Sequence, residues 1–137
     1  MSIVQTQTTS FKTELYQGVH DLSTDTLKIA LYTASADLNQ NTTIYSTANE
    51  VTGTGYTAGG VVLTGVTINS SDYTAYVDFA DVVFGASVTA RCALIYNVTQ
   101  GNKSIAVLDF GSDKTSSNFT ITMPANTASA ALIRSSN

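Results

Sequence analysis

Charged residues are scarce in this chain of 137 residues: Asp, Glu, Lys and Arg together make up 12% of it. An average soluble domain has about 25%. The chain also has one cysteine, one proline and no tryptophan. The single cysteine, Cys92, excludes an internal disulfide. The six basic residues are scattered and the net charge is −4. We therefore expect no nucleic acid as a partner, because its binding depends on clustered Lys and Arg.

Long apolar runs are missing as well. No stretch reaches the length of a transmembrane helix. The polar residues 1–9 lack the basic and apolar regions of a secretion signal. We therefore expect no membrane partner and synthesis in the cytoplasm.

The polar surface must instead be made largely of Ser, Thr, Asn, Gln and Gly. A chain of this mass folds to roughly 6,800 Å² of accessible surface, or about 430 Å² for each charged residue. Uncharged polar groups lose less hydration energy than ions when they are buried. This composition suits a protein whose faces pack against neighbouring proteins. A neutral β surface without any partner is the alternative interpretation.

The periodicity of apolar residues predicts an all-β fold. Residues 1–9 are predicted to form an extended N-terminal arm, and Ser10 to cap a short helix over 11–17 that Gly18 ends. The remaining apolar residues alternate with a period of two, which predicts eight short strands. These strands cover about 26–33, 61–68 (broken), 73–79, 82–84, 88–97, 104–110, 118–123 and 128–134.

Short strands at this spacing favour an antiparallel β-sandwich of the jelly-roll type with one short N-terminal helix. Residues 10–137 then form a single β-sandwich domain. Within the strand over 88–97, alternation places Val88, Ala90, Cys92, Leu94 and Tyr96 on one face. The irregular residues 34–60 are too long for an idle connection, so we expect them to be functional or to carry structure of their own.

No residue pattern predicts catalysis, a cofactor or a metal site. His20, the one histidine, has no recognisable nucleophile motif near it and is interpreted as a surface or turn residue. Cys92 is interpreted as a small core residue. Asp78 and Asp81 could serve glycoside hydrolysis or bind calcium, but aspartates at strand ends usually make turns. We therefore expect that the protein is not an enzyme.

Tyrosine is the most informative residue type that is present. Five of the seven tyrosines are predicted to point outward from strands or to lie in loops, and tyrosine favours interfaces because it combines apolar area with a hydroxyl. Partial burial at the sandwich edges explains them equally well. They are Tyr32, Tyr45, Tyr56, Tyr76 and Tyr96.

Six segments, in order along nearly the whole chain, resemble the capsid cement (decoration) proteins of tailed phages, a family with a jelly-roll fold. The chain departs from the family pattern at Phe84, where a tryptophan is expected. The segments are Phe11–Gly18, Leu27–Thr33, Gly53–Gly60, Ala75–Phe79, Ala93–Asn97 and Val107–Gly111.

This resemblance implies a structural virion protein, made in the cytoplasm of a bacterial host and bound to the outer capsid surface. Its partners would be the major capsid protein and further copies of itself, as a dimer or trimer. We expect the contacts to involve Ile3, Val4, Phe11, Tyr16 and Tyr56. The alternative function is a tail or fibre module that recognises host-surface glycans, because tyrosines can stack on sugars.

Overall fold

The computed structural model describes residues 2–136, which form one α-helix and ten β-strands. This confirms the prediction of an antiparallel all-β sandwich with one short helix. The elements are β1 (Thr6–Gln7), α1 (Thr9–Tyr16), β2 (Leu27–Tyr32), β3 (Val61–Val62), β4 (Thr67–Ser71), β5 (Thr74–Asp78), β6 (Val82–Val83), β7 (Val88–Asn97), β8 (Lys103–Ser116), β9 (Thr120–Ile121) and β10 (Ile133–Ser135).

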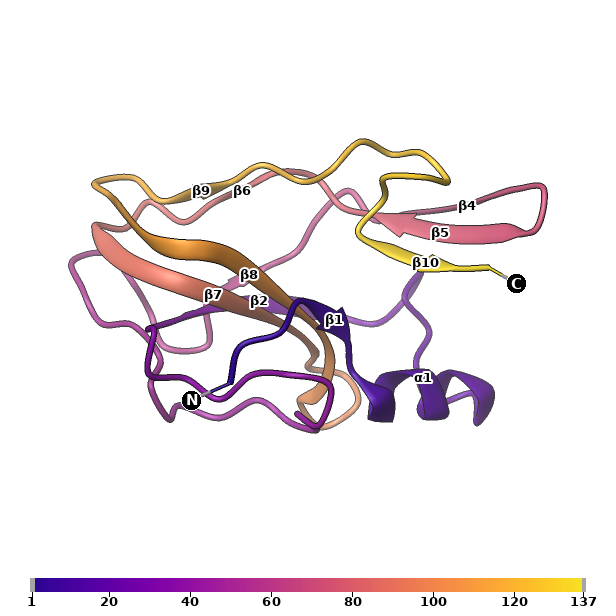
Figure 1. The fold of residues 1–137 in the computed structure, drawn as a ribbon, viewed down its shortest axis with the longest axis horizontal. Coiled ribbons are helices and arrows are strands. Elements are labelled where there is room, and N and C mark those ends of the chain that lie inside the picture. The colour runs from indigo at the N-terminus through magenta and orange to yellow at the C-terminus, as the bar shows by residue number, and fades with distance from the viewer. Residues whose placement is uncertain (1, 137) are drawn as a thin grey trace.

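Two layers of strands enclose the main core. One layer is a five-stranded sheet with the order β1-β8-β7-β2-β3. The other is divided into the three-stranded sheet β10-β5-β4 and the two-stranded ribbon β6-β9. Figure 1 shows the ribbon above the long strands β7 and β8, and the three-stranded sheet extending beyond them. Apolar side chains from both layers meet between them, including Ile29, Ile95, Phe79, Phe119 and Ile133.

The five-stranded sheet also buries apolar side chains on its other face. A second cluster there contains Ala30, Leu94 and Val107 from the strands, and Leu38 from the irregular region that follows β2. A sheet that is buried on both faces explains why β2, β7 and β8 read as almost continuous apolar runs.

The N-terminal segment lies along the body of the protein. Ile3 makes a bridge to Leu38, and β1 pairs with β8 in antiparallel fashion. The segment is extended through Thr8, whose side chain accepts a hydrogen bond from the Phe11 N–H and caps α1. The prediction that Ser10 is the cap was therefore wrong, because the buried Thr8 hydroxyl is held in place by Ser104 and fills this role.

A β-bulge corrects the predicted faces of β7. The pairing of β7 with β8 shifts between Ala90 and Cys92. Ala90 therefore faces the main core, whereas Cys92 and Leu94 face the second cluster. The one extra residue of a bulge reverses the face of every later side chain in the strand. Simple alternation predicts one face for all three residues, because the bulge does not show in the apolar pattern.

The last strand is shorter than its apolar pattern predicts. The predicted strand covers 128–134, but β10 begins only at Ile133. The Thr127 carbonyl accepts hydrogen bonds from the N–H groups of Ala130 and Ala131, which turns the backbone there. This turn removes the first half of the predicted strand.

Candidate functional site

Residues 34–60 form a layer over the second face of the five-stranded sheet and along β2; we call these residues the cover layer. Figure 1 shows them as the purple to magenta irregular chain beneath and beside β7, β8 and β2. Ala36, Leu38 and Tyr45 pack against the second apolar cluster. The Thr33 N–H donates to the Asn49 carbonyl, and the Val51 N–H donates to the Leu31 carbonyl. The segment contains no helix or strand of its own, and isolated bridges and packing against the sheet hold it in place.

Glu50 fastens the cover layer at its centre. Its Oε1 accepts a hydrogen bond from the Tyr45 hydroxyl at 2.6 Å. Its Oε2 accepts one from the Tyr56 hydroxyl at 2.5 Å and one from the Gly59 N–H at 2.8 Å. The Tyr56 hydroxyl also accepts a hydrogen bond from the Leu31 N–H of β2 at 3.0 Å. One carboxylate thus joins three points of an irregular segment, and each of these points contacts the sheet.

Two further tyrosines fasten the layer from the sheet side. The Tyr32 hydroxyl donates to the Ser46 carbonyl and the Tyr96 hydroxyl to the Gly59 carbonyl, both at 2.6 Å. The Tyr96 ring stacks on Tyr45 with the ring centroids 4.5 Å apart. The prediction that Tyr32 and Tyr96 point outward was wrong, because the cover layer buries the face on which they lie.

Burial changes the acidity of this tyrosine cluster. It raises the pKa of Tyr96 to about 12, with a further contribution from the Glu50 charge. Burial and the hydrogen bonds to Glu50 raise the pKa of Tyr45 and Tyr56, and burial raises that of Tyr32. The hydroxyls stay protonated at neutral pH and act as hydrogen-bond donors that fix the chain.

The outer surface of the cover layer is polar and almost free of charge. Its 27 residues include two carboxylates, Asp37 and Glu50, and no Lys or Arg. Glu50 is used internally, and Asp37 accepts a hydrogen bond from the Ser2 N–H. Most side chains on the outside are Ser, Thr, Asn and Gln, and Ile44 is 53% exposed among them. The result is a fixed, hydroxyl-rich and amide-rich surface with one large apolar side chain.

His20 lies in the loop after α1 and is buried, so the prediction of a surface residue was wrong. Its Nε2 lies 2.8 Å from Glu14 Oε1, and its Nδ1 lies 2.9 Å from Asn97 Nδ2. The Gln100 N–H donates to Asn97 Oδ1, which turns the Asn97 amide nitrogen toward the ring. His20 Nδ1 therefore accepts, and Nε2–H donates to Glu14. The imidazole joins α1 to the end of β7.

Asp25 shares the amide nitrogen of Asn97. Burial alone would raise the pKa of Asp25, but hydrogen bonds from Asn97, from the Asp21 N–H and from Gln100 outweigh it and lower the pKa. The network around His20 thus consists of side chains that satisfy one another, and it holds the loop before β2 against the turn after β7.

A groove of about 770 Å³ separates α1 from the three-stranded sheet. Leu15 and Tyr16 of α1 line one side, and Ile68 and Tyr76 line the other. Tyr16 is 93% exposed and Ile68 53% exposed. The groove also has charged side chains at its rim, Lys12, Asp21 and Arg134.

The five residues expected to make partner contacts lie in different parts of the molecule. Tyr16 is exposed at the groove, and Val4 is 43% exposed in the N-terminal segment. Ile3 is half-buried against the second cluster. Tyr56 is half-buried, and both its ring and its hydroxyl are engaged, the ring beside Phe84. The expectation was wrong for Phe11, which is fully buried in the main core and is not accessible to a partner.

Glu50 is the residue that the sequence analysis missed. It is the only Glu in a segment of 27 residues, and it lies between Tyr45 and Tyr56 in the sequence. An isolated acid flanked by tyrosines in an otherwise uncharged segment is the signal that could have found it.

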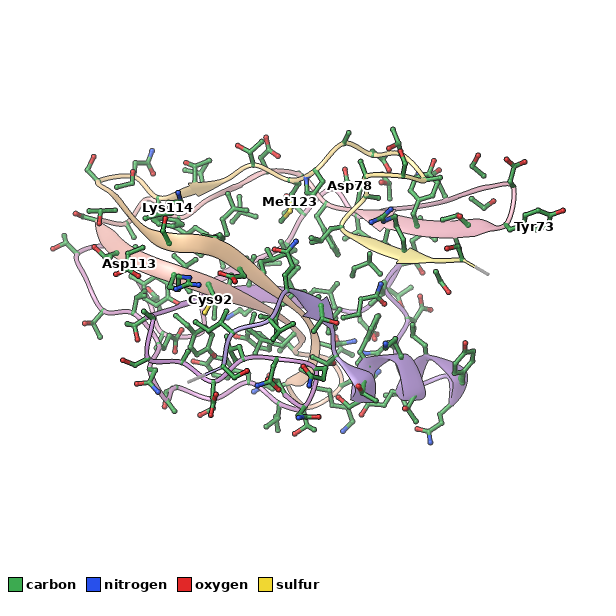
Figure 2. All side chains as sticks on the ribbon, viewed as in Figure 1. Tyr73, Asp78, Cys92, Asp113, Lys114 and Met123 are labelled. Carbon is green, nitrogen blue, oxygen red and sulfur yellow. The ribbon has the colours of Figure 1, made fainter. Side chains whose placement is uncertain are left out.

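The remaining candidate residues, Cys92, Asp78 and Asp81, are described by their burial and hydrogen bonds. Cys92 is fully buried, as predicted, and burial raises the pKa of its thiol to about 12; Figure 2 shows it between the sheet and the cover layer. Asp81 Oδ1 accepts a hydrogen bond from the Met123 N–H, and Asp78 Oδ1 is buried with no hydrogen-bond partner among the described residues. Within residues 2–136, no group of three His, Cys, Asp or Glu side chains is placed to hold a metal ion. In the same residues, no helix has the length and apolarity to cross a membrane.

Comparison of the chain with protein-family models, with curated proteins and with solved structures finds no significant match.

Proposed function

We propose that this protein is a capsid cement (decoration) protein of a tailed phage, which binds the outside of the capsid shell and stabilises contacts between major capsid protein subunits. The observation that carries the proposal is the cover layer: a long irregular segment, almost without charge, that one carboxylate and four tyrosines hold in a single conformation. The resemblance of six sequence segments to cement proteins, a family with a jelly-roll fold, supports the same function.

A fixed surface favours tight contact because little conformational entropy is lost on binding. An uncharged polar surface favours it as well, because hydroxyl and amide groups cost less to desolvate than ions. In this proposal the cover layer faces the shell, with Ile44 as the apolar side chain that a capsid subunit buries. Val4 of the neighbouring N-terminal segment adds to the contact.

Repetition makes such a contact effective. A standard protein interface buries about 1,600 Å². Many copies around a shell, each spanning a boundary between capsid subunits, multiply its effect against the outward pressure of packaged DNA. The protein then works without a catalytic residue or a cofactor, as a component of the virion on the outer capsid surface.

The test combines location with a surface variant. Cryo-EM of the parent virion is expected to show the chain on the outer capsid surface in hundreds of copies. Binding to empty capsids is expected to weaken at least about tenfold in Ile44→Asp, because a carboxylate would be buried in the contact. Val83→Asp is the matched control, since Val83 is 59% exposed in the opposite layer, on β6. Density only at the tail, or equal weakening by both variants, would contradict the proposal.

A tail or fibre module that recognises host glycans is the second candidate, and the groove between α1 and the three-stranded sheet favours it. Tyr16 and Tyr76 can stack on sugar rings, and Asp21 and Arg134 can bind sugar hydroxyls. Glycan binding by the pure protein that Tyr16→Ala abolishes, together with no affinity for empty capsids, would favour this function over the first.

A further inference from the structure

Strand β4 forms an open edge of the three-stranded sheet. Within residues 2–136 it pairs only with β5, and all five of its residues are exposed. Figure 1 shows the β4–β5 hairpin extending away from the body, and Figure 2 shows Tyr73 at its tip pointing into solvent. Among the described residues outside the hairpin, Asn126 makes a hydrogen bond to β4, through the Thr67 hydroxyl. The backbone from Ile68 to Ser71 is left open.

The register of the hairpin fixes which backbone groups point outward. Ser71 and Thr74 flank the two-residue turn Asp72–Tyr73. A pair that closes such a turn exchanges two hydrogen bonds, and hydrogen-bonded pairs then alternate along the ladder. The N–H and C=O groups of Ile68 and Ser70 therefore point away from β5, toward solvent.

The other strand edges are short, occupied or, where β8 runs past β1, protected by the charged Asp113 and Lys114. The outer strands of the five-stranded sheet, β1 and β3, have two residues each. At the β10 side of the three-stranded sheet, Gln7 Nε2 donates to the Arg134 carbonyl. Proteins usually protect longer edges with Lys, Pro, a bulge or an inward-pointing charge. The β4 sequence, Thr-Ile-Asn-Ser-Ser, has none of these.

We infer that β4 is a self-association edge, and that it pairs in antiparallel fashion with β4 of a second copy across a two-fold axis at Asn69. In this register, Ile68 of each copy lies opposite Ser70 of the other. The four outward N–H groups and their four carbonyl partners then match completely, because both members of each pair point toward the other copy. A two-fold axis is the symmetry that antiparallel pairing of identical strands requires, so the assembly is a dimer and not a trimer.

Charge does not oppose a second copy at this edge. Two chains of net charge −4 repel each other over most of their surfaces, but the β4 strand has no ionisable side chain. The nearest carboxylate on the turn is Asp72. In the proposed register the two Asp72 residues lie at opposite ends of the paired strands, roughly 20 Å apart.

The apolar side chains favour the same pairing. Ile133, Val77 and Ile68 form one cross-strand row on the same face of the sheet. Ile133 and Val77 are buried, whereas Ile68 is 53% exposed at the end of the row. Two copies would place their Ile68 side chains as diagonal neighbours, within reach of each other. The apolar row then continues across the subunit boundary.

This inference rests on the self-association in the proposed function and names its surface. It is tested on the isolated protein by sedimentation velocity over about 5–500 µM. We expect a concentration-dependent species of twice the 14.4 kDa chain mass. Two variants are expected to raise the dissociation constant at least about tenfold. Ile68→Lys adds two cations to the edge, and Ser70→Pro removes an outward N–H that the β4–β5 ladder does not use.

Val83→Lys is the matched control, because Val83 is similarly exposed (59% against 53% for Ile68) on a different strand, and it is expected to leave the dimer unchanged. Circular dichroism and thermal melting establish that each variant is folded. A wild-type monomer throughout the concentration range, a trimer, or dimers that persist in both edge variants would overturn the inference. If the wild-type protein forms this dimer but does not bind empty capsids, only the proposed function is contradicted.

Discussion

Glu50 shows how one side chain can determine the form of a long segment. Two tyrosine hydroxyls and one backbone N–H converge on its carboxylate. Hydrogen bonds to a charged group contribute more than neutral ones, and removing the acceptor leaves donors unpaired. The conformation of the cover layer therefore depends on this residue more than on any propensity of its sequence.

We expect Glu50→Ala to lower the free energy of unfolding by about 3 kcal/mol and to make residues 34–60 accessible to proteases. Glu50→Gln should lower the free energy of unfolding less, because its amide oxygen can still accept hydrogen bonds from Tyr56 and Gly59. Urea unfolding and limited proteolysis measure both effects. Asp113→Asn is the control, since Asp113 is an exposed carboxylate on β8 (Figure 2) and should change stability little.

The buried tyrosines predict how stability changes in alkali. In the unfolded chain a tyrosine has a pKa of about 10, and in the folded protein that of Tyr96 is raised to about 12. A raised pKa means that folding favours the protonated hydroxyl, so its contribution is complete below pH 10 and is lost as the pH rises through 12. Urea unfolding between pH 8 and pH 11 should show this loss beginning near pH 10. A free energy of unfolding that stays constant to pH 11 would contradict the prediction.

At the scale of elements, the cover layer depends on how closely its backbone approaches β2. Gly60 has φ +80°, and a Cβ atom there would lie 1.8 Å from the Ile29 carbonyl oxygen. That oxygen belongs to a central strand of the molecule and cannot move aside. Glycine at this position therefore determines where the segment leaves the sheet.

Gly60→Ala should destabilise the protein by at least about 3 kcal/mol, because strain in φ and a backbone clash act together. Gly101→Ala separates the two effects. Gly101 also has positive φ, but nothing lies within 4 Å of its added Cβ, so its cost should be only about 1 kcal/mol. Equal losses in the two variants, measured by thermal and urea unfolding, would contradict the close approach.

The elements also show what the sequence can and cannot predict. Alternation over Leu27–Tyr32 predicts β2 within a residue of its bounds, because a regular strand leaves a regular apolar pattern. The bulge before Cys92 and the Glu50 cluster produce no periodic pattern in the sequence. Both depend on contacts between residues that are not neighbours in the sequence. For the same reason the apolar pattern does not reveal that Tyr32 and Tyr96 are covered.

At the scale of the whole molecule, the two proposed surfaces lie on different sides of the sandwich. The cover layer lies on the far side of the five-stranded sheet, and the β4 edge belongs to the opposite layer (Figure 1). A copy bound to a shell through its cover layer would therefore leave its β4 edge free to reach a neighbouring copy. In the proposed function, the first contact would hold the protein to the shell and the second would join sites across it.

The low charge of the molecule predicts that capsid binding depends little on salt. Ion pairs between exposed groups weaken as ionic strength rises, whereas contacts between hydroxyl, amide and apolar groups do not. The cover layer has two carboxylates, and Glu50 is already satisfied within the protein. The dissociation constant for empty capsids should therefore change less than about threefold between 50 and 500 mM NaCl. Ile44→Lys should introduce a salt dependence. A wild-type affinity that falls steeply with salt would mean that ions make the contact, and the cover layer would then be the wrong surface.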